Sequence, residues 1–430
     1  MKDVLKLTNG MSTLEILIAT AVLTTTLSAA ALMLFSTQDA VRAVRSDIDA
    51  IAHATITPPH APSENMCGTL ANLGSPLTHY DYPTASLPSG GMEITDIQVT
   101  HNTLYVAARS SVTGNTLHLF TLANPNTPPT YLGGIDNIPT VVSAGLSSIA
   151  VQKKYVYGAN GYGANFTSCS EAANCAQLQI FDVQDPSNPH LSINRKVPGV
   201  LGSGGQGAGS VVVQKNGYLY LGLTKTGSGP EFHIFDVGAN TGSSTNPLWL
   251  GSFTVGRTIN DIAVIGNTVY LATDDSSREL IVLNVADKTQ PKLSTAFNAP
   301  GTTNFGYGFS LAQSQNSIVF GRSYVSNAPE LYQLTLAAGP LSSYDIGTST
   351  YPDGIDALLT ASSTTFAITN TRLYSLYTNT GVLTSVLSLA SFGALASDRR
   401  ASLACAGVFL VAAIPLNAHN QDTLSFVTTP

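Results

Sequence analysis

The sequence predicts an all-β region made of repeated four-stranded units, preceded by one long N-terminal α-helix. Three observations predict this: an apolar N-terminal run, a strand pattern that recurs along the chain, and glycine and proline spread throughout it. Of 430 residues, 37 are Gly and 22 are Pro, which suits short strands joined by turns and disfavours a helical domain.

The charge balance excludes one class of partner. Charged residues make up only 10% of the chain, and the formal net charge is −7. Because no basic field exists to displace the counterions of a polyphosphate, we expect no nucleic acid as a partner.

The first expected element is the N-terminal helix. Residues 1–10 are polar, and the apolar run from Met11 to Phe35 contains Glu15 as its only ionisable side chain. At about 1.5 Å per residue, this run is long enough to cross a hydrocarbon core. Apolar residues continue at helical spacing beyond it, so we expect one helix over 11–57, ended by two prolines.

This N-terminal pattern resembles the leader and first helix of type IV pilins and pseudopilins. The matching features are Gly10 at the end of a short basic leader, an apolar run that opens at Met11, and Glu15 as the fifth residue after the glycine. The resemblance implies that a prepilin peptidase cleaves after Gly10 and methylates the new terminus. It also implies that Glu15 pairs with the Met11 amine of a neighbouring subunit in a filament core.

Two departures from the family pattern are visible. Met11 stands where phenylalanine is usual, and the helix lacks the proline that often kinks pilin helices. The alternative interpretation is an ordinary signal anchor, in which Glu15 reaches back to the membrane interface. A charge deep in a bilayer costs about 2.5–3.5 kcal/mol, so a pairing role that fixes the register of neighbouring helices would explain why the carboxylate is there.

After a linker over 58–75, the region 76–430 repeats itself. The clearest unit, over 260–297, has an apolar strand, a turn, a second strand with an aromatic residue, a polar loop, a third strand, a turn with proline and a fourth strand. Similar first, second and third strands recur in the rest of the region. A period near about 45 residues with four strands per unit is typical of a β-propeller blade.

The two ends of the repeat region complement one another. Seven first strands are present, but the last unit ends at Pro430 after its third strand. Residues 75–85 precede the first full unit and can supply the missing strand. We therefore expect a seven-bladed β-propeller closed by its N- and C-terminal strands, because closure hides edges that would otherwise invite aggregation.

Some units resemble LVIVD-type propeller repeats, above all over 178–191 and 280–293. This resemblance covers 94–301 and fades in the last three units. It implies a fold rather than an activity.

Four cysteines form an even set, which favours disulfides in an exported chain. Cys169 and Cys175 would close a small loop. Cys405, at the first turn of the last unit, faces the side where the linker enters, so the topology predicts a Cys67–Cys405 bond that clasps the ring. Neither pair has zinc-ligand spacing.

A polar register runs through the starts of the first strands, at Asp96, Ser148, Ser210, Asp261, Ser310, Asp356 and Ser402. These side chains could line the central channel, where Asp96, Asp261 and Asp356 could bind a cation. The commoner role of such short polar groups is to satisfy backbone donors at strand starts, and we expect that role here.

No catalytic constellation emerges from the sequence. The G-x-G-x-x-G match over 202–207 precedes a strand, whereas a dinucleotide site needs a helix after it. His118 and His233 occupy the second position of third strands, as Gln179 and Tyr332 do, and are interpreted as strand-face residues. We therefore expect no enzyme activity, no cofactor and no metal.

The resemblance to type IV pilins implies a filament subunit, or fimbrial protein, and we expect it to display its propeller on the cell surface for adhesion or another surface interaction. Its expected partners are identical or homologous pilin subunits and a prepilin peptidase. It would reside in the inner membrane before assembly and in an extracellular filament afterwards. Two alternatives stay open: a membrane-anchored extracytoplasmic propeller enzyme or receptor that does not polymerise, and a type II secretion pseudopilin.

Overall fold

The computed structural model describes part of the chain. The described residues are 78–80, 92–110, 114–122, 129–136, 145–161, 176–200, 206–240, 242–243, 245–300, 306–314, 317–337, 339–346, 354–361, 363–369, 371–388, 401–406, 409–414 and 423–428. The chain divides into two compact units between Glu64 and Asn65, inside the predicted linker.

The first unit lies wholly outside the described residues, and with it the predicted leader, the helix over 11–57 and the residues Gly10, Met11 and Glu15. The described residues contain strands and turns but no α-helix. Within them, no segment meets the length and hydropathy needed for a membrane-spanning helix.

The described strands of the second unit form seven four-stranded antiparallel sheets. In six of them, four consecutive strands lie side by side in chain order. The first three are β2 (Met92–Thr100), β3 (Thr103–Ser110), β4 (Leu117–Thr121) and β5 (Thr130–Ile135); β6 (Leu146–Gln152), β7 (Tyr155–Asn160), β8 (Leu178–Asp182) and β9 (His190–Arg195); and β10 (Gly209–Lys215), β11 (Tyr218–Leu223), β12 (Phe232–Asp236) and β13 (Leu248–Phe253).

The next three sheets have the same order. They are β14 (Ile259–Ile265), β15 (Thr268–Thr273), β16 (Leu280–Asn284) and β17 (Lys292–Phe297); β18 (Gly308–Ser314), β19 (Ser317–Arg322), β20 (Leu331–Thr335) and β21 (Pro340–Tyr344); and β22 (Ala357–Ala361), β23 (Thr364–Ile368), β24 (Arg372–Tyr377) and β25 (Val382–Ser388).

The last sheet joins the two ends of the ring. It contains β26 (Ser402–Ala406), β27 (Phe409–Ile414), β28 (Thr423–Thr428) and β1 (Thr78–Tyr80), in the order β1-β28-β27-β26. β1 pairs antiparallel with β28, with His79 opposite Ser425. The predicted closure is therefore confirmed: a strand within residues 75–85 completes the C-terminal unit.

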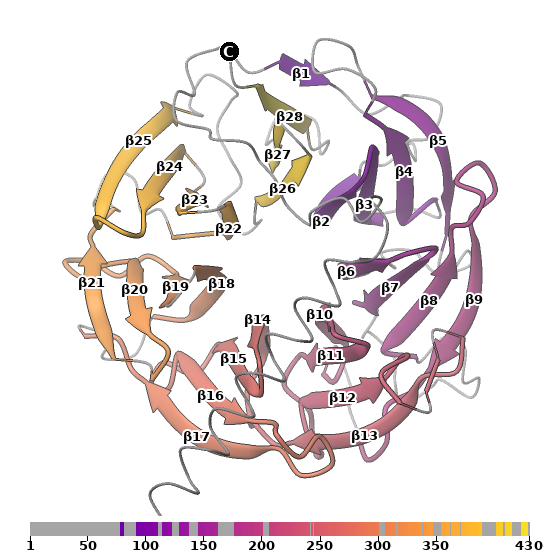
Figure 1. Ribbon diagram of the computed structural model, residues 1–430, viewed down its shortest axis with the longest axis horizontal. Coiled ribbons are helices and arrows are strands. Elements are labelled where there is room, and N and C mark those ends of the chain that lie inside the picture. Colours follow the sequence, from indigo (N-terminus) through magenta and orange to yellow (C-terminus); the bar gives the residue numbers. More distant parts are fainter. Residues whose placement is uncertain are drawn as a thin grey trace, which may run out of the picture. The chain divides into compact units, whose positions relative to one another are not determined.

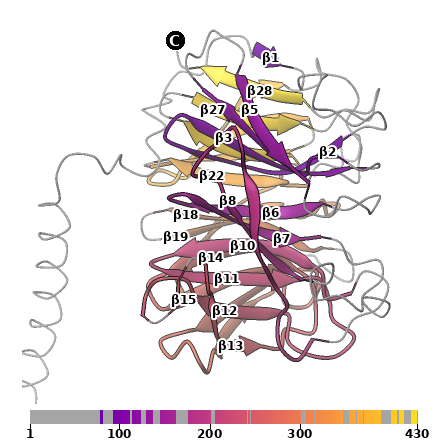
Figure 2. The ribbon, with the colours of Figure 1, turned by 90° about the vertical axis from the view of Figure 1, so that its right-hand side faces the viewer.

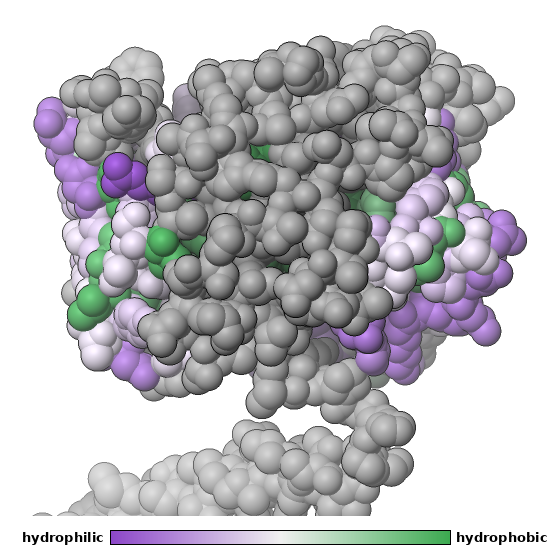
Figure 3. All heavy atoms as spheres, turned by 90° about the horizontal axis from the view of Figure 1, so that it is seen from above, coloured by the Kyte–Doolittle hydropathy of each residue, from purple (hydrophilic) through white to green (hydrophobic). Residues whose placement is uncertain are grey.

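The sheets surround a central axis, and the fold is an all-β propeller. Figure 1 shows the first strands, such as β2, β14 and β18, facing the centre, while the fourth strands β13, β17, β21 and β25 run along the outside. Figure 2 shows the same sheets from the side. In Figure 3, the described residues at the two flanks mix hydrophilic and hydrophobic side chains.

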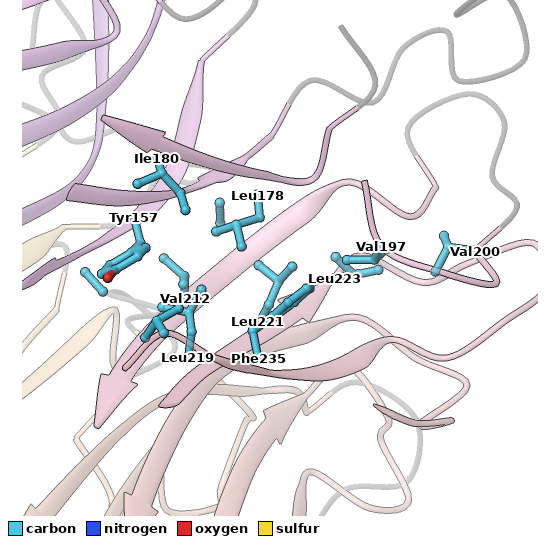
Figure 4. Packing of buried hydrophobic residues seen from close by; sticks show 13 residues of the cluster. Tyr157, Leu178, Ile180, Val197, Val200, Val212, Leu219, Leu221, Leu223 and Phe235 are labelled. Atoms are coloured by element: carbon cyan, nitrogen blue, oxygen red, sulfur yellow. The ribbon is translucent and has the colours of Figure 1, made fainter. Parts of the chain in front are cut away.

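The core lies between neighbouring sheets. Middle strands such as β12 are buried along their whole length because both of their faces pack against another sheet, whereas the fourth strand β13 is half exposed. Figure 4 shows one such interface, where Leu178 and Ile180 of one sheet meet Leu219 and Leu221 of the next. This arrangement explains why most residues of the third strands are apolar.

Two outer turns pack against glycines of the preceding sheet. A Cβ on Gly251 of β13 would lie 2.5 Å from the Lys288 carbonyl oxygen, in the turn between β16 and β17. A Cβ on Gly133 of β5 would lie 2.7 Å from the Pro186 carbonyl oxygen, in the turn between β8 and β9. Only a residue without a side chain permits this approach.

Candidate functional site

The predicted polar register lies beside an irregularity that recurs in the first strands. A register shift occurs just before Asp96, Ser148, Asp261 and Ser310. Each of these residues then pairs with a small residue of the second strand, namely Ala107, Ala159, Ala272 and Gly321. The shift is a β-bulge, which re-aims the side chain that follows it.

Asp96 connects the sheets on either side of its own. Its Oδ2 accepts hydrogen bonds from the Ile149 backbone N–H and the Ser148 hydroxyl, both at 2.9 Å. Its Oδ1 accepts one from the Ser402 hydroxyl of the closing sheet at 3.3 Å. Burial raises the pKa of Asp96 to about 6, although these hydrogen bonds oppose the rise.

The same kind of bond recurs around the centre of the ring. In each case a register side chain accepts a backbone N–H of the next sheet. These bonds join Val212 N to Ser148 Oγ (3.3 Å), Leu311 N to Asp261 Oδ2 (2.7 Å), Ala401 N to Asp356 Oδ2 (3.2 Å) and Ile97 N to Ser402 Oγ (3.3 Å). We call this set, with Asp96, Ser210 and Ser310, the inner belt.

Two serines of the inner belt donate instead of accepting. Ser310 Oγ donates to the Ile355 carbonyl at 3.0 Å, and Ser210 Oγ donates to the Ile259 carbonyl at 2.6 Å. Both bonds also cross to the next sheet.

The placement of Ser210 corrects the predicted register. Val211, not Ser210, pairs with Gly222 at the place that Asp96 takes in its own sheet. Ser210 is the extra residue of the bulge, one position earlier. A repeat alignment cannot show this, because a bulge adds one residue without changing the apolar pattern around it.

The inner belt has the structural role that we expected for it. The carboxylates of Asp96, Asp261 and Asp356 accept backbone N–H groups, and Asp261 Oδ1 also accepts the Ile262 N–H at 2.7 Å. Within the described part of the chain, no three His, Cys, Asp or Glu side chains come together as metal ligands would. Through these hydrogen bonds, Asp96, Asp261 and Asp356 link neighbouring sheets.

The structure shows a second belt of buried polar residues that we did not predict from the sequence. The residue directly before a third strand is buried and accepts the backbone N–H of the segment that leads to the next sheet. These bonds join Val197 N to Gln177 Oε1 (3.1 Å), Val255 N to Glu231 Oε2 (2.9 Å), Ala299 N to Glu279 Oε2 (2.9 Å) and Ile346 N to Glu330 Oε2 (2.9 Å). A Gln or Glu before four consecutive third strands is a signal that could have revealed it.

One member of the second belt also holds a buried ion pair. Arg322 Nη1 lies 3.2 Å from Glu279 Oε1, and both side chains are fully buried. Arg322 Nε donates to the Pro329 carbonyl at 2.7 Å, and its guanidinium lies 5.5 Å from the centre of the Tyr332 ring. Burial raises the pKa of Glu279, and the charge of Arg322 opposes this rise.

The two strand-face histidines are fully buried between sheets. His118 Nε2 is 2.9 Å from the Asn115 carbonyl oxygen, and His233 Nε2 is 3.0 Å from that of Pro230. Burial lowers the pKa of each imidazole to about 4, so both are neutral at pH 7. This confirms the interpretation of His118 and His233 as strand-face residues.

The remaining sequence candidates are placed as follows. The segment 202–207 is followed by the strand β10, as expected. Cys405 lies buried in β26 and is disulfide-bonded. Because Cys67, Cys169 and Cys175 lie outside the described residues, the Cys67–Cys405 and Cys169–Cys175 pairings stay predictions.

Comparison with known proteins shows the fold alone. The WD40 propeller domain of Doa1 matches with a TM-score of 0.50 and 12% identity, over 79% of this chain and 94% of that one. YCF48 bound to D1 peptide matches with a TM-score of 0.53 and 9% identity, over 83% and 96%. The extracellular domain of a putative one-component system from B. thetaiotaomicron matches with a TM-score of 0.51 and 11% identity, over 82% and 39%.

No family model and no curated protein matches the chain. The resemblances to pilin leaders and to LVIVD repeats thus rest on the residues quoted for them. The β-propeller fold is the conclusion that the sheets and the solved structures share.

Proposed function

We propose that this chain is a type IV pilin-like filament subunit that assembles through residues 11–57 and displays its propeller on the cell surface. The observation that carries the proposal is the pattern of Gly10, Met11 and Glu15 around an uninterrupted apolar run. Adhesion or another surface interaction would be the task of the propeller.

Assembly requires chemistry at only three residues. A prepilin peptidase would cleave after Gly10 and methylate the amine of Met11. In the filament core, Glu15 of one subunit would pair with that amine on a neighbour. Loss of one partner from such a buried pair costs about 3–5 kcal/mol, which would make the pair decisive for register between subunits.

The state of the polar groups in the propeller supports a display role over catalysis. The carboxylates of Asp96 and Asp261 and the buried pair of Glu279 and Arg322 are engaged in contacts between sheets. YCF48, a propeller of similar fold, is bound to D1 peptide in its structure. A propeller of similar fold can therefore bind a peptide.

Closure of the ring also suits a filament head, which must pass mechanical load from its stem to its globular part. The N-terminal strand β1 is hydrogen-bonded to β28, and Cys405 in the same sheet is disulfide-bonded. A Cys67–Cys405 bond would transfer load from the linker directly to β26, the innermost strand of that sheet.

Replacement of Glu15 tests the proposal. We expect the Glu15→Ala chain to stay membrane-inserted and to disappear from sheared surface fibres. Asp39→Ala is the matched control, because it removes the same charge outside the apolar run and should leave incorporation unchanged.

Three outcomes would contradict the proposal. Incorporation of Glu15→Ala at the level of the unchanged chain would remove the role of the carboxylate. An unchanged chain that never polymerises would favour the membrane-anchored enzyme or receptor. Cleavage after Gly10 with only a short periplasmic structure would favour the secretion pseudopilin.

A further inference from the structure

The exposed large apolar side chains of the described residues gather at one end of the sheets. Leu248 and Trp249 open β13, and Leu293 is the second residue of β17. Leu336 directly follows β20, and Val382 opens β25. All five lie next to a turn that joins a third strand to a fourth, and we call them the turn rim.

The topology places the turn rim on a single edge of the propeller. In an antiparallel meander, the turns between strands one and two and between strands three and four lie at the same end of the sheet. The turn rim thus spans four consecutive sheets, whose outer strands β13, β17, β21 and β25 follow one another in Figure 1. The sixth exposed large apolar residue, Tyr307, precedes β18 at the opposite end.

The same end carries more lysines than carboxylates in the neighbouring sheets. Its lysines are Lys153, Lys154, Lys215, Lys288 and Lys292, and its solvent-facing carboxylates are Asp182, Asp185 and Asp287. A fourth carboxylate, that of Asp236, is buried and accepts backbone N–H groups of the turn before β13. One of these carboxylates is already paired, since Lys154 Nζ lies 3.7 Å from Asp182 Oδ2. Lys292 stands directly before Leu293, so a positive charge adjoins the apolar surface at the start of β17.

We propose that the turn rim rests on an anionic bilayer surface. Its leucines, valine and tryptophan would enter the interfacial region, where an amphipathic ring such as that of tryptophan is favoured. The lysines would meet lipid phosphates, an attraction that salt screens. The opposite end of the propeller, which carries the connections between sheets, would then point away from the membrane.

The observations favour a membrane over a second copy of the chain. Two turn rims placed face to face would bring lysines against lysines, and like charges at an interface are unfavourable. A head-to-tail contact would need another apolar surface, and Tyr307 is the only other exposed large apolar residue in the described ranges. A fluid bilayer accepts separated apolar side chains without a complementary shape. The inference does not depend on filament assembly, since any form tethered to a membrane could dock in this way.

Trp249 allows a direct test, because it is the only tryptophan in the chain. The full-length chain would be reconstituted into vesicles that contain phosphatidylglycerol and brominated phosphatidylcholine. We expect Trp249 emission to shift to the blue, to be lost to the brominated chains, and to be shielded from aqueous acrylamide. Added salt should weaken all three effects.

Two variants serve as matched controls. In W249F/Y307W the single tryptophan moves to the opposite end, where we expect quenching by acrylamide and none by brominated lipid. In K215Q/K292Q, with an unchanged urea unfolding midpoint as the check on folding, we expect less quenching of Trp249 by brominated lipid and a weaker dependence on salt.

Each contrary result overturns the proposal. If acrylamide quenches Trp249 emission and brominated lipid does not, the turn rim faces water. Shielding that rises with the protein-to-lipid ratio, without quenching by brominated lipid, would assign the rim to a second copy. Equal quenching in purely zwitterionic vesicles would remove the role of the lysines, and equal quenching of Y307W would remove the orientation. None of these results bears on Glu15 and fibres, so the two proposals fail separately.

Discussion

The interfaces between sheets and the turn rim differ in which side chains they bury and which they expose. At the interfaces, polar groups are buried and bonded across the gap, as Asp96 is to Ile149 and Arg322 is to Glu279. At the turn rim, apolar groups face solvent, and the side chain of Val382 is 51% exposed. The same four-stranded unit therefore holds bonded polar groups inside its largely apolar interfaces and exposes separate apolar side chains at its rim.

This contrast indicates where substitutions will change the stability of the fold. A buried group that loses its partner cannot regain a bond to water, so removal of one partner costs more than the bond itself contributes. When a side chain of the turn rim is removed, water fills its place and the free energy of unfolding changes little. We therefore expect sensitivity to fall steadily from the interfaces to the rim.

The largest effect is expected at the ion pair between sheets. Glu279→Ala would leave the Arg322 guanidinium buried without its charge partner and should lower the free energy of unfolding by about 3–5 kcal/mol. Urea unfolding measures this loss. Because an apolar pair can replace a buried ion pair, E279L/R322M should recover most of it. A cost below about 1 kcal/mol for Glu279→Ala would contradict the comparison.

The inner belt should come second. Asp96→Ala removes the acceptor of the Ile149 N–H and should lower the free energy of unfolding by about 2–3 kcal/mol. Asp96→Asn keeps an acceptor oxygen and should cost less than about 1 kcal/mol. Equal losses in the two variants, measured by urea unfolding, would show that the charge of Asp96 matters rather than its hydrogen bonds.

Acidification should lower the stability of the fold through its two buried histidines. His118 and His233 have a pKa of about 4 in the fold and 6.5 when unfolded, so the unfolded chain binds more protons between these values. Stability is therefore fully present above pH 6.5 and is lost progressively as the pH falls towards 4.

Asp96 acts in the opposite direction over nearly the same range. Its pKa is about 6 in the fold against 3.8 when unfolded, so its contribution favours the folded state as the pH falls through 6. Asp96→Asn removes this offset and should steepen the loss of stability on acidification, whereas H118Q/H233Q should flatten it. Thermal unfolding from pH 7 to pH 4 measures both slopes, and unchanged slopes would contradict the assignment.

A smaller effect is expected where an outer turn meets the preceding sheet. The methyl group of Gly251→Ala would meet the Lys288 and Thr289 backbone at 2.5 and 2.8 Å, and should cost about 1–2 kcal/mol through overpacking. Thr295→Ala is the matched control, because Thr295 pairs with Val282 as Gly251 pairs with Ile234. A larger loss in the control, by urea unfolding, would contradict the close approach at Gly251.

The smallest effect is expected on the turn rim. Leu293→Ser removes a side chain that is 50% exposed and should change the free energy of unfolding by no more than about 0.5 kcal/mol. A loss comparable to that of Asp96→Ala would mean that the rim is part of the folded core, and the comparison would fail.

The sequence predicts the propeller and its closure well because both follow from repeated local patterns. The third strands over 178–182 and 280–284 alternate with turns in the same order each time, and the fourth strand missing at the C-terminus is present near residue 78. The interpretation of His118 and His233 follows in the same way from their shared position in a strand.

What the sequence could not predict depends on the pairing of individual residues within a sheet and on contacts between sheets. The bulge before Asp96 and the different role of Ser210 depend on which residue is left unpaired. The ion pair of Glu279 and Arg322 joins residues of two different sheets, so no local sequence pattern predicts it. The predictions for Gly10, Met11 and Glu15 concern residues outside the described part of the chain and stay predictions.

The central proposal is that the N-terminal segment is cleaved after Gly10 and packs with those of neighbouring subunits, and mass spectrometry of the mature N-terminus tests the cleavage most directly. We predict a chain that begins with an N-methylated Met11. An intact Met1 on the mature, surface-exposed protein would contradict the account, whatever the propeller then binds.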